Sequence, residues 1–249
     1  MSVVVFADLD DTLFQTRRKL RGNEGNLTPA TVDSTGEPHS FATPSQVALW
    51  SLLASSGATV IPVTGRDSTA MARVTLRFSS WRVLDHGATI LRPDGTVDAA
   101  WAAFVREQLG ACADMLELVT REGEALAHEL ECRVRRHDVH GVHFMSVAKH
   151  STADPFALAK LQDRWEARVD GTPLHVIANA NNVTVLPRAL GKTEAVSYLL
   201  EHHFSDAILT LGLGDSVSDL GFMNLCDFAV TPTRGQLLRA VTSVRLPQR

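Results

Sequence analysis

The sequence has little cysteine, no excess of positive charge and no long hydrophobic segment. Its three cysteines, Cys112, Cys132 and Cys226, fit neither a disulfide framework nor a zinc site, and they favour a reducing cytoplasm. With 24 Lys and Arg against 28 Asp and Glu, the chain lacks the basic surface of a non-specific nucleic-acid binder. No apolar run approaches the ~20 residues that cross a bilayer, and the segment MSVVVFADLDD lacks the basic region of a signal peptide. We therefore expect a cytoplasmic globular protein whose partner is neither a nucleic acid nor a membrane.

Short apolar runs alternate with helical patterns in the first and last parts of the chain. The runs at 3–7, 59–63 and 207–211 show no polar alternation, which is typical of parallel strands covered on both faces. Helical patterns lie between them, at 44–56 (with Thr43 as N-cap and Gly57 as terminator), 67–78 and 193–200. This alternation predicts an α/β core built on a doubly wound parallel sheet.

The middle of the chain has a different pattern. A helix followed by two strands is predicted twice, over 101–129, 131–136 and 142–148, and then from Asp154, over 175–178 and 183–186. We therefore expect an inserted antiparallel α+β domain over 93–187, with 1–92 and 188–249 forming the core. The segment 21–40, rich in Gly, Asn, Thr and Pro, is expected to be a long loop or a short hairpin.

The acidic segment Asp8-Leu9-Asp10-Asp11-Thr12 follows the first predicted strand. In an extended chain Asp8 and Asp10 point to one side, roughly 6–7 Å apart. Two carboxylates at this separation repel each other unless a cation lies between them, and Mg²⁺ prefers oxygen ligands of this kind. Taken alone, the segment is equally consistent with an acidic turn in which Thr12 caps a helix.

Three further segments place polar groups where strands end or helices begin: Thr64-Gly65-Arg66, Gly191-Lys192-Thr193 and Gly212–Asp219. In open α/β sheets the ligand crevice lies outside the carboxyl ends of the strands. Carboxylates, a hydroxyl and an ammonium group collected there suit phosphoryl transfer. A dinucleotide fingerprint is excluded because Val217 replaces its third glycine, and a P-loop is excluded because Leu186 replaces its first.

In their order along the chain these motifs resemble those of the haloacid dehalogenase-like (HAD) phosphohydrolase superfamily. The matching residues are Asp8-Leu9-Asp10-Asp11-Thr12, Thr64, Lys192, and Gly214-Asp215 through Asp219. The insert between the second and third motifs resembles the type C2 cap of the sucrose-phosphatase-like and Cof-like branches. Two positions depart from the pattern: His86 stands where those branches often have Asn, and Ser218 stands where many relatives have Asn.

The resemblance implies a HAD (Rossmann-like) core and a Mg²⁺-dependent phosphatase that forms an aspartyl-phosphate. Asp8 would be the nucleophile and Asp10 the general acid and base. The metal site would comprise Asp8, Asp10 through its backbone carbonyl, Asp215 and Asp219, the last of these orienting Lys192 or a metal-bound water. The groups implied in binding the phosphoryl group and substrate are Thr64, Gly65, Arg66, Lys192 and Asn182.

Residues of the insert are expected to contact the rest of a small phosphate monoester. They are Arg133, Arg135, Arg136, Lys149, His150, Asn179, Asn181 and Asn182, and the amides among them favour a sugar or polyol phosphate. A phosphomutase of the same fold is the first alternative. The others are a phospho-accepting signalling receiver, which is typically about half this length, and a sugar-phosphate-binding protein without activity. The presence of both Asp8 and Asp10 speaks against the last.

Overall fold

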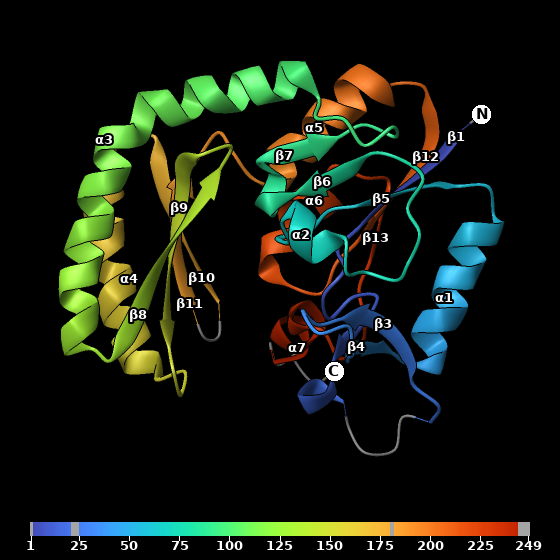
Figure 1. Cartoon of the computed structure of the whole chain (residues 1–249), viewed down its shortest axis with the longest axis horizontal. Coiled ribbons are helices and arrows are strands. Elements are labelled where there is room, and N and C mark those ends of the chain that lie inside the picture. The colour runs from blue at the N-terminus through green and yellow to red at the C-terminus, as the bar shows by residue number, and fades with distance from the viewer. Residues whose placement is uncertain (1, 21–24, 180–181, 244–249) are drawn as a thin grey trace, which may run out of the picture. The chain divides into compact units, whose positions relative to one another are not determined.

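The computed structural model describes residues 2–20, 25–179 and 182–243, which divide into two units (Figure 1). Unit 1 contains the residues up to Asp98 and those from Lys192 onward, and unit 2 is Ala99–Gly191. Both boundaries lie a few residues beyond the expected ones at Pro93 and Pro187. At the first boundary the reason is pairing within unit 1, because Val97 bridges Leu91 and the Asp98 N–H donates to a neighbouring carbonyl.

Unit 1 is built on a parallel sheet with strand order β13-β12-β1-β5. Its strands are β1 (Ser2–Ala7), β5 (Thr59–Pro62), β12 (Ala207–Leu213) and β13 (Phe228–Val230). The first three coincide with the apolar runs of the sequence, so the predicted parallel α/β core is confirmed. For β1 and β5, whose successive residues are mostly buried, burial on both faces explains why the strands carry so little polar alternation.

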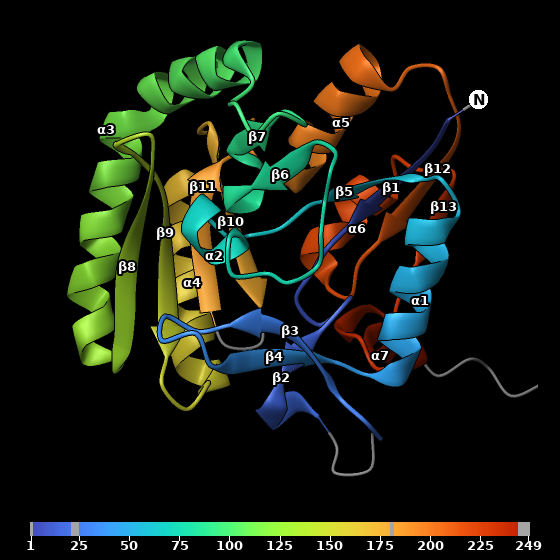
Figure 2. The ribbon, with the colours of Figure 1, turned by 45° about the vertical axis from the view of Figure 1, so that its right-hand side comes forward.

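Helices cover both faces of this sheet, as Figure 2 shows for α1 (Pro44–Ser55) and α5 (Lys192–His203). Val5 packs in one apolar cluster with Leu53 of α1. The next side chain of β1, Phe6, points the other way and meets the ring of Phe204, just after α5, at 6.4 Å. Thr43 begins α1 with a capping box, as its sequence predicts.

The helix expected over 67–78 is much shorter, and this prediction was wrong. The observed α2 is Ser68–Met71. Beyond it the chain pairs with a strand instead: Val74 bridges Thr31, and the Thr75 N–H donates to the Ala30 carbonyl. Apolar periodicity in this stretch therefore reflects packing against a strand, which local pattern does not reveal.

In the segment expected as a loop or hairpin, β3 and β4 pair as a hairpin in a small antiparallel sheet of order β2-β4-β3, and residues 21–24 lie outside the described residues. Its strands are β2 (Gln15–Thr16), β3 (Thr28–Val32) and β4 (Pro38–Ala42). The sequence also did not reveal a hairpin of β6 (Arg82–Leu84) and β7 (Thr89–Leu91). The short helices α6 (Leu220–Met223) and α7 (Gln236–Ser243) complete the described part of unit 1.

Unit 2 is an antiparallel sheet of order β10-β11-β9-β8, packed against two helices. Along the chain its elements are α3 (Ala99–Glu129), β8 (Cys132–Val139), β9 (Val142–His150), α4 (Pro155–Val169), β10 (Leu174–Asn179) and β11 (Asn182–Pro187). This is the doubled helix–strand–strand order that the sequence predicts. Trp165 of α4 is fully buried in the core and donates from its indole N–H to the Val119 carbonyl of α3 at 3.1 Å.

Within the described ranges, no helix is both long and apolar enough to cross a membrane. All three cysteines are free thiols.

The close approach of α3 and α4 gives a test of this packing. A Cβ added at Gly123 would lie 2.5 Å from the Trp165 ring, whereas one added at Gly110, on the same helix, would meet nothing within 4 Å. We expect Gly123→Ala to lower the free energy of unfolding by about 1–3 kcal/mol. The matched Gly110→Ala variant should raise it by roughly 0.5–1 kcal/mol, because alanine is the better helix former. Urea unfolding followed by tryptophan fluorescence measures both, and changes of the same sign would contradict the packing.

Candidate active site

The parallel strands of unit 1 place the motif residues at their carboxyl ends. Asp8 directly follows β1, and its N–H donates to the Leu213 carbonyl of β12 at 2.8 Å. Thr64 follows β5 and is 1% exposed, and Asp215 follows β12. Lys192 is the first residue of α5. The tertiary fold thus brings four segments that are distant in sequence to the same edge of the sheet.

A buried ammonium group links two carboxylates at the centre of this edge. Lys192 Nζ lies 2.7 Å from Asp8 Oδ1 and 2.7 Å from Asp219 Oδ1. The three residues are 9%, 6% and 0% exposed, respectively. Removing one partner from a buried ion pair typically costs 3–5 kcal/mol, because the remaining charge is left unpaired. Lys192 therefore holds Asp8 and Asp219 in place as well as supplying positive charge.

Asp219 has no free oxygen. Its second oxygen, Oδ2, accepts from the N–H of Asp215 at 3.3 Å and from the N–H and hydroxyl of Ser216 at 3.0 and 2.7 Å. The close approach needs Gly214, since a Cβ there would lie 2.4 Å from Asp219 Cβ. Asp219 therefore orients Lys192 and the loop after β12. This is the first of the two roles that the resemblance implied for it.

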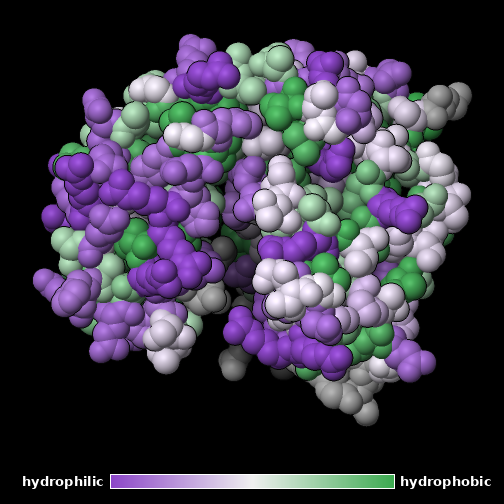
Figure 3. Space-filling model, viewed as in Figure 1, coloured by the Kyte–Doolittle hydropathy of each residue, from purple (hydrophilic) through white to green (hydrophobic). Residues whose placement is uncertain are grey.

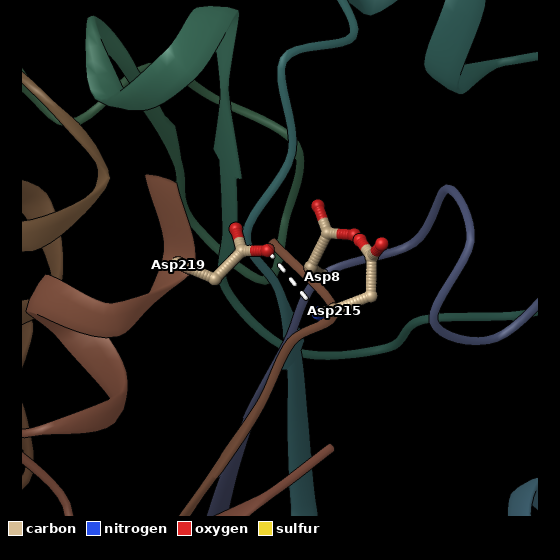
Figure 4. A group of neighbouring side chains, drawn as sticks. All are labelled: Asp8, Asp215 and Asp219. Atoms are coloured by element: carbon tan, nitrogen blue, oxygen red, sulfur yellow. Dashed lines mark hydrogen bonds between the residues drawn. The ribbon is translucent and has the colours of Figure 1, made fainter. Parts of the chain in front are cut away.

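Asp215 is different because its carboxylate has no hydrogen-bond or ion-pair partner among the described residues. Oxygens of Asp8, Asp215 and Asp219 lie within 4.8 Å of one another, and Figure 4 shows the carboxylates of Asp8 and Asp215 side by side. Hard oxygen donors at this separation fit Mg²⁺. Asp8 and Asp215 are the side chains best placed to hold it, since Asp219 is already saturated.

Burial and negative neighbours oppose ionisation of this cluster in the absence of a cation. Burial raises the pKa of Asp8 to about 7; the Lys192 ammonium opposes this shift and Asp219 adds to it. Burial, together with Asp219 and Asp11, raises the pKa of Asp215 to about 6. Burial alone would lower the pKa of Lys192, but the two carboxylates outweigh it and hold that pKa above its usual value.

Asp10 lies outside this carboxylate cluster. Its two oxygens accept a bidentate pair of hydrogen bonds from Arg66, at 2.8 and 2.7 Å. The Arg66 guanidinium is also stacked over the Phe14 ring at 5.3 Å. The sequence placed Arg66 among the groups that bind substrate, whereas in the structure its fork is occupied by Asp10. Such a bidentate pair fixes the orientation of the carboxylate.

Thr64 and Gly65 form a tight turn beneath a histidine. The Thr64 hydroxyl accepts from the Arg66 N–H at 3.2 Å, and the Thr64 carbonyl accepts from the His86 N–H at 3.0 Å. A Cβ at Gly65 would lie 2.3 Å from the His86 ring, so only glycine fits. His86 itself adopts a left-handed conformation with φ of 54°. The histidine that replaces the family's asparagine thus lies directly against the motif backbone.

Sequence reasoning missed one ion pair beside the cluster, between Lys19 and Asp11. Asp11 adopts a left-handed conformation with φ of 67°, and Lys19 follows in the short helical turn Arg17–Lys19. Both residues influence the pKa of Asp215. The Arg-Arg-Lys run so soon after the acidic motif was the available signal. No helix begins at Thr12, whose hydroxyl donates to Asp8 at 3.1 Å, so the capping interpretation of that residue was wrong.

The structure separates the residues expected to contact substrate in unit 2. Arg136 binds Glu117 and Glu124, so it is engaged with α3. The His150 ring accepts from the N–H groups of Thr152 and Asp154, just before α4. Arg133, Arg135 and Lys149 are exposed, and Asn182 is half-buried. Asn181 and the Asn179 side chain lie outside what the structure describes.

Comparisons with known proteins were made for the sequence and for the structure. No family model matches the sequence, and no curated protein sequence matches it either. Among solved structures, the sucrose-phosphatase from Synechocystis sp. PCC6803 in complex with sucrose and phosphate has a TM-score of 0.65 at 19% identity, covering 98% of this chain and 89% of that one. The C-terminal domain of C. albicans trehalose-6-phosphate phosphatase has a TM-score of 0.54 at 17% identity, with 90% and 72% covered.

A haloacid dehalogenase-like hydrolase from B. subtilis has a TM-score of 0.55 at 13% identity, with 98% of this chain and 93% of that one covered. This chain has the HAD-like hydrolase fold. The resemblance found from the motifs is therefore confirmed at the level of the fold. In this HAD-like fold the acidic motif follows β1, Thr64 follows β5, Lys192 begins α5 and Asp215 follows β12. The motifs thus lie at ends of strands and helices, in the order in which they occur along the chain.

The unpartnered Asp215 carboxylate gives a test of the metal site. An acid whose pKa is raised in the folded state destabilises the protein once it is deprotonated, so the metal-free protein should lose stability between about pH 4 and 7. Asp215→Asn should therefore raise the metal-free Tm at pH 8 by about 2–4 °C, or ~1 kcal/mol. Mg²⁺ at 100 times its Kd should stabilise the wild type by about 2.7 kcal/mol and the variant far less.

Thermal unfolding with and without Mg²⁺ measures these shifts. Asp206→Asn is the matched control, because Asp206 is exposed and should change neither the metal-free Tm nor the gain on adding Mg²⁺. Equal stabilisation of the wild type and Asp215→Asn by Mg²⁺ would rule out Asp215 as a ligand.

Proposed function

We propose that this protein is a Mg²⁺-dependent phosphatase that hydrolyses a small phosphate monoester, a sugar or polyol phosphate. One observation carries the proposal: the Asp8 carboxylate is held by the buried Lys192 ammonium and lies beside the carboxylate of Asp215, for which the described residues offer no hydrogen-bond or ion-pair partner. A nucleophile, a cation and a metal-ligand pair thus meet at the carboxyl edge of a parallel sheet. Phosphoryl transfer needs this combination of positioning and charge neutralisation.

The first half-reaction transfers the phosphoryl group to the protein. A carboxylate oxygen of Asp8 attacks the phosphorus, and the bond between phosphorus and the leaving oxygen breaks. Asp10 donates the proton that the leaving oxygen takes up. Arg66 binds both oxygens of Asp10 in the structure, so one of these hydrogen bonds is open while Asp10 carries the proton and forms again once the proton is transferred. Arg66 is therefore a positioning residue for Asp10.

The second half-reaction releases phosphate. Asp10 accepts a proton from water as the water oxygen attacks the phosphorus of the aspartyl-phosphate. The bond between phosphorus and the Asp8 oxygen breaks, which regenerates the Asp8 carboxylate. Splitting the displacement into two steps uses the same acid twice, once as proton donor and once as proton acceptor.

The phosphoryl oxygens would be bound by Lys192, the Thr64 hydroxyl and the Gly65 N–H. A bound Mg²⁺ would be held by Asp8, Asp215 and the Asp10 carbonyl, and it would reduce the repulsion between the nucleophile and the anionic substrate. Lys192, whose Nζ lies 2.7 Å from Asp8 Oδ1, would serve the same end.

The substrate class is supported by the solved structures of similar fold, which are a sucrose-phosphatase and trehalose-6-phosphate phosphatases. Unit 2 would act as the cap that selects the substrate. The free thiols of all three cysteines support a cytoplasmic location.

Release of inorganic phosphate tests the proposal. Purified protein with Mg²⁺ should hydrolyse members of a panel of sugar and polyol phosphates, and chelation of the metal should stop hydrolysis. Asp8→Asn should lower kcat by about 10³-fold or more, since the covalent route is lost. Asp206→Asn, an exposed aspartate away from the cluster, should keep wild-type kcat.

Turnover by Asp8→Asn close to the wild-type rate would reject the nucleophile. A phosphomutase would instead return an isomeric monoester with no free phosphate, and product analysis separates the two activities. Binding of the esters without either product would identify a non-catalytic binding protein.

A further inference from the structure

The sheet of unit 2 has one face covered by helices. Val183 and Val185 of β11 and Ala148 of β9 pack there with core residues of α3 and α4. Because successive side chains of a strand point to opposite faces, their neighbours along the strands lie on the other face. We call this other face the basic face; its polar residues include Arg133, Arg135, Lys149, Asn182 and Thr184.

Charge is divided unequally between the two faces. The four strands contain four Lys and Arg residues and one acid, Asp138. Arg136 points to the helices, where it binds Glu117. Asp138 is paired in register with His143, whose ring lies 2.9 Å from the buried Ser146 hydroxyl on the helix-covered side. The three remaining cations therefore lie on the basic face with no acid among them.

The cations of the basic face are also unpaired. On the helix-covered side of unit 2, Arg121, Arg136, Arg164 and Arg168 all form ion pairs with glutamates of α3. Arg133, Arg135 and Lys149 are exposed and form no ion pair within the described ranges. Among the described residues, unit 2 thus pairs these four arginines with glutamates and leaves the three cations of the basic face without an ion pair.

The strand register places like charges next to each other. Arg133 lies directly opposite Lys149 on the neighbouring strand, and Lys149 lies directly opposite Asn182. Like charges in directly opposed positions destabilise a sheet. A bound anion would remove this cost, and a guanidinium next to an ammonium is well suited to a carboxylate or phosphate. The neighbouring amide and the Thr184 hydroxyl can hydrogen-bond to alcohol groups.

We propose that the basic face binds a small polyhydroxylated anion and, resting on the proposed function, that this ligand is the substrate. The part of the phosphate monoester that leaves would then carry its own negative charge, a carboxylate or a second phosphate. Sucrose, the sugar in the similar solved structure, has no such charge. Three cations on a chain of net charge −4 are too few for a nucleic acid, which needs many phosphate contacts. Figure 3 shows hydrophilic side chains gathered where β8 and β9 lie in Figure 1.

Matched substrate pairs test the inference with the full chain and Mg²⁺. The pairs are glycerol 3-phosphate with 3-phosphoglycerate, glucose 6-phosphate with 6-phosphogluconate, and fructose 6-phosphate with fructose 1,6-bisphosphate. In at least one pair, we expect kcat/KM to be higher by about 10-fold or more for the ester that carries the additional carboxylate or phosphate. This is the effect of about one charge-assisted contact. Comparison of the carboxylate and bisphosphate pairs identifies the anionic group.

The double variant Arg133→Gln/Lys149→Gln should reduce this preference to near one, mainly through a higher KM for the charged ester. Its Tm should not fall, because a repulsive pair is removed. Lys160→Gln removes one exposed positive charge from α4 and is the control; its preference should equal that of the wild type.

Equal kcat/KM within every pair would overturn the inference, and so would a preference for the ester with the additional charge that survives in the double variant. In both cases the observed hydrolysis would still support the proposed function. Binding of a polyanion such as RNA that the double variant loses, with no preference among esters, would assign the face to a polymer and also overturn it. No hydrolysis of any ester would reject the proposed function and this inference with it.

Discussion

The buried ammonium of Lys192 between the carboxylates of Asp8 and Asp219 is the interaction on which the catalytic edge depends. It joins the ends of β1, α5 and the loop after β12, through contacts between residues 184 and 27 positions apart in the chain. Taking these charges out of water is costly, and only their close mutual contact offsets the cost. The same contact that stabilises the edge therefore also positions the Asp8 carboxylate.

The charge balance of this edge makes it suitable for a cation. Lys192 neutralises one of the two carboxylates it contacts, and Asp215 adds a further acid with no partner among the described residues. Burial raises the pKa of both Asp8 and Asp215, so the metal-free edge favours protons. A divalent cation would offset the repulsion between the carboxylates by electrostatic attraction. Asp219 is not available to bind the cation, because its oxygens already accept four hydrogen bonds.

The two faces of the sheet of unit 2 differ in what they carry. Its helix-covered face carries the apolar core around Trp165 and pairs its cations with glutamates. Its other face carries Arg133 and Lys149 without acidic partners in the described chain. Because the period of a strand is two, substitutions on the basic face leave the side chains of the core face in place.

The sequence by itself determined the architecture, since uninterrupted apolar runs, the Thr43 cap and the doubled helix–strand–strand order are local patterns. It also determined which chemistry-bearing residues lie at strand ends and helix starts, because each motif directly follows an apolar run or begins a helical pattern. Only the tertiary structure decided their partners: Arg66 binds Asp10, Arg136 turns to α3, and the chain after Met71 pairs with a strand in place of continuing as a helix. Partner choice depends on contacts between segments far apart in the chain, and no local period or spacing encodes those contacts.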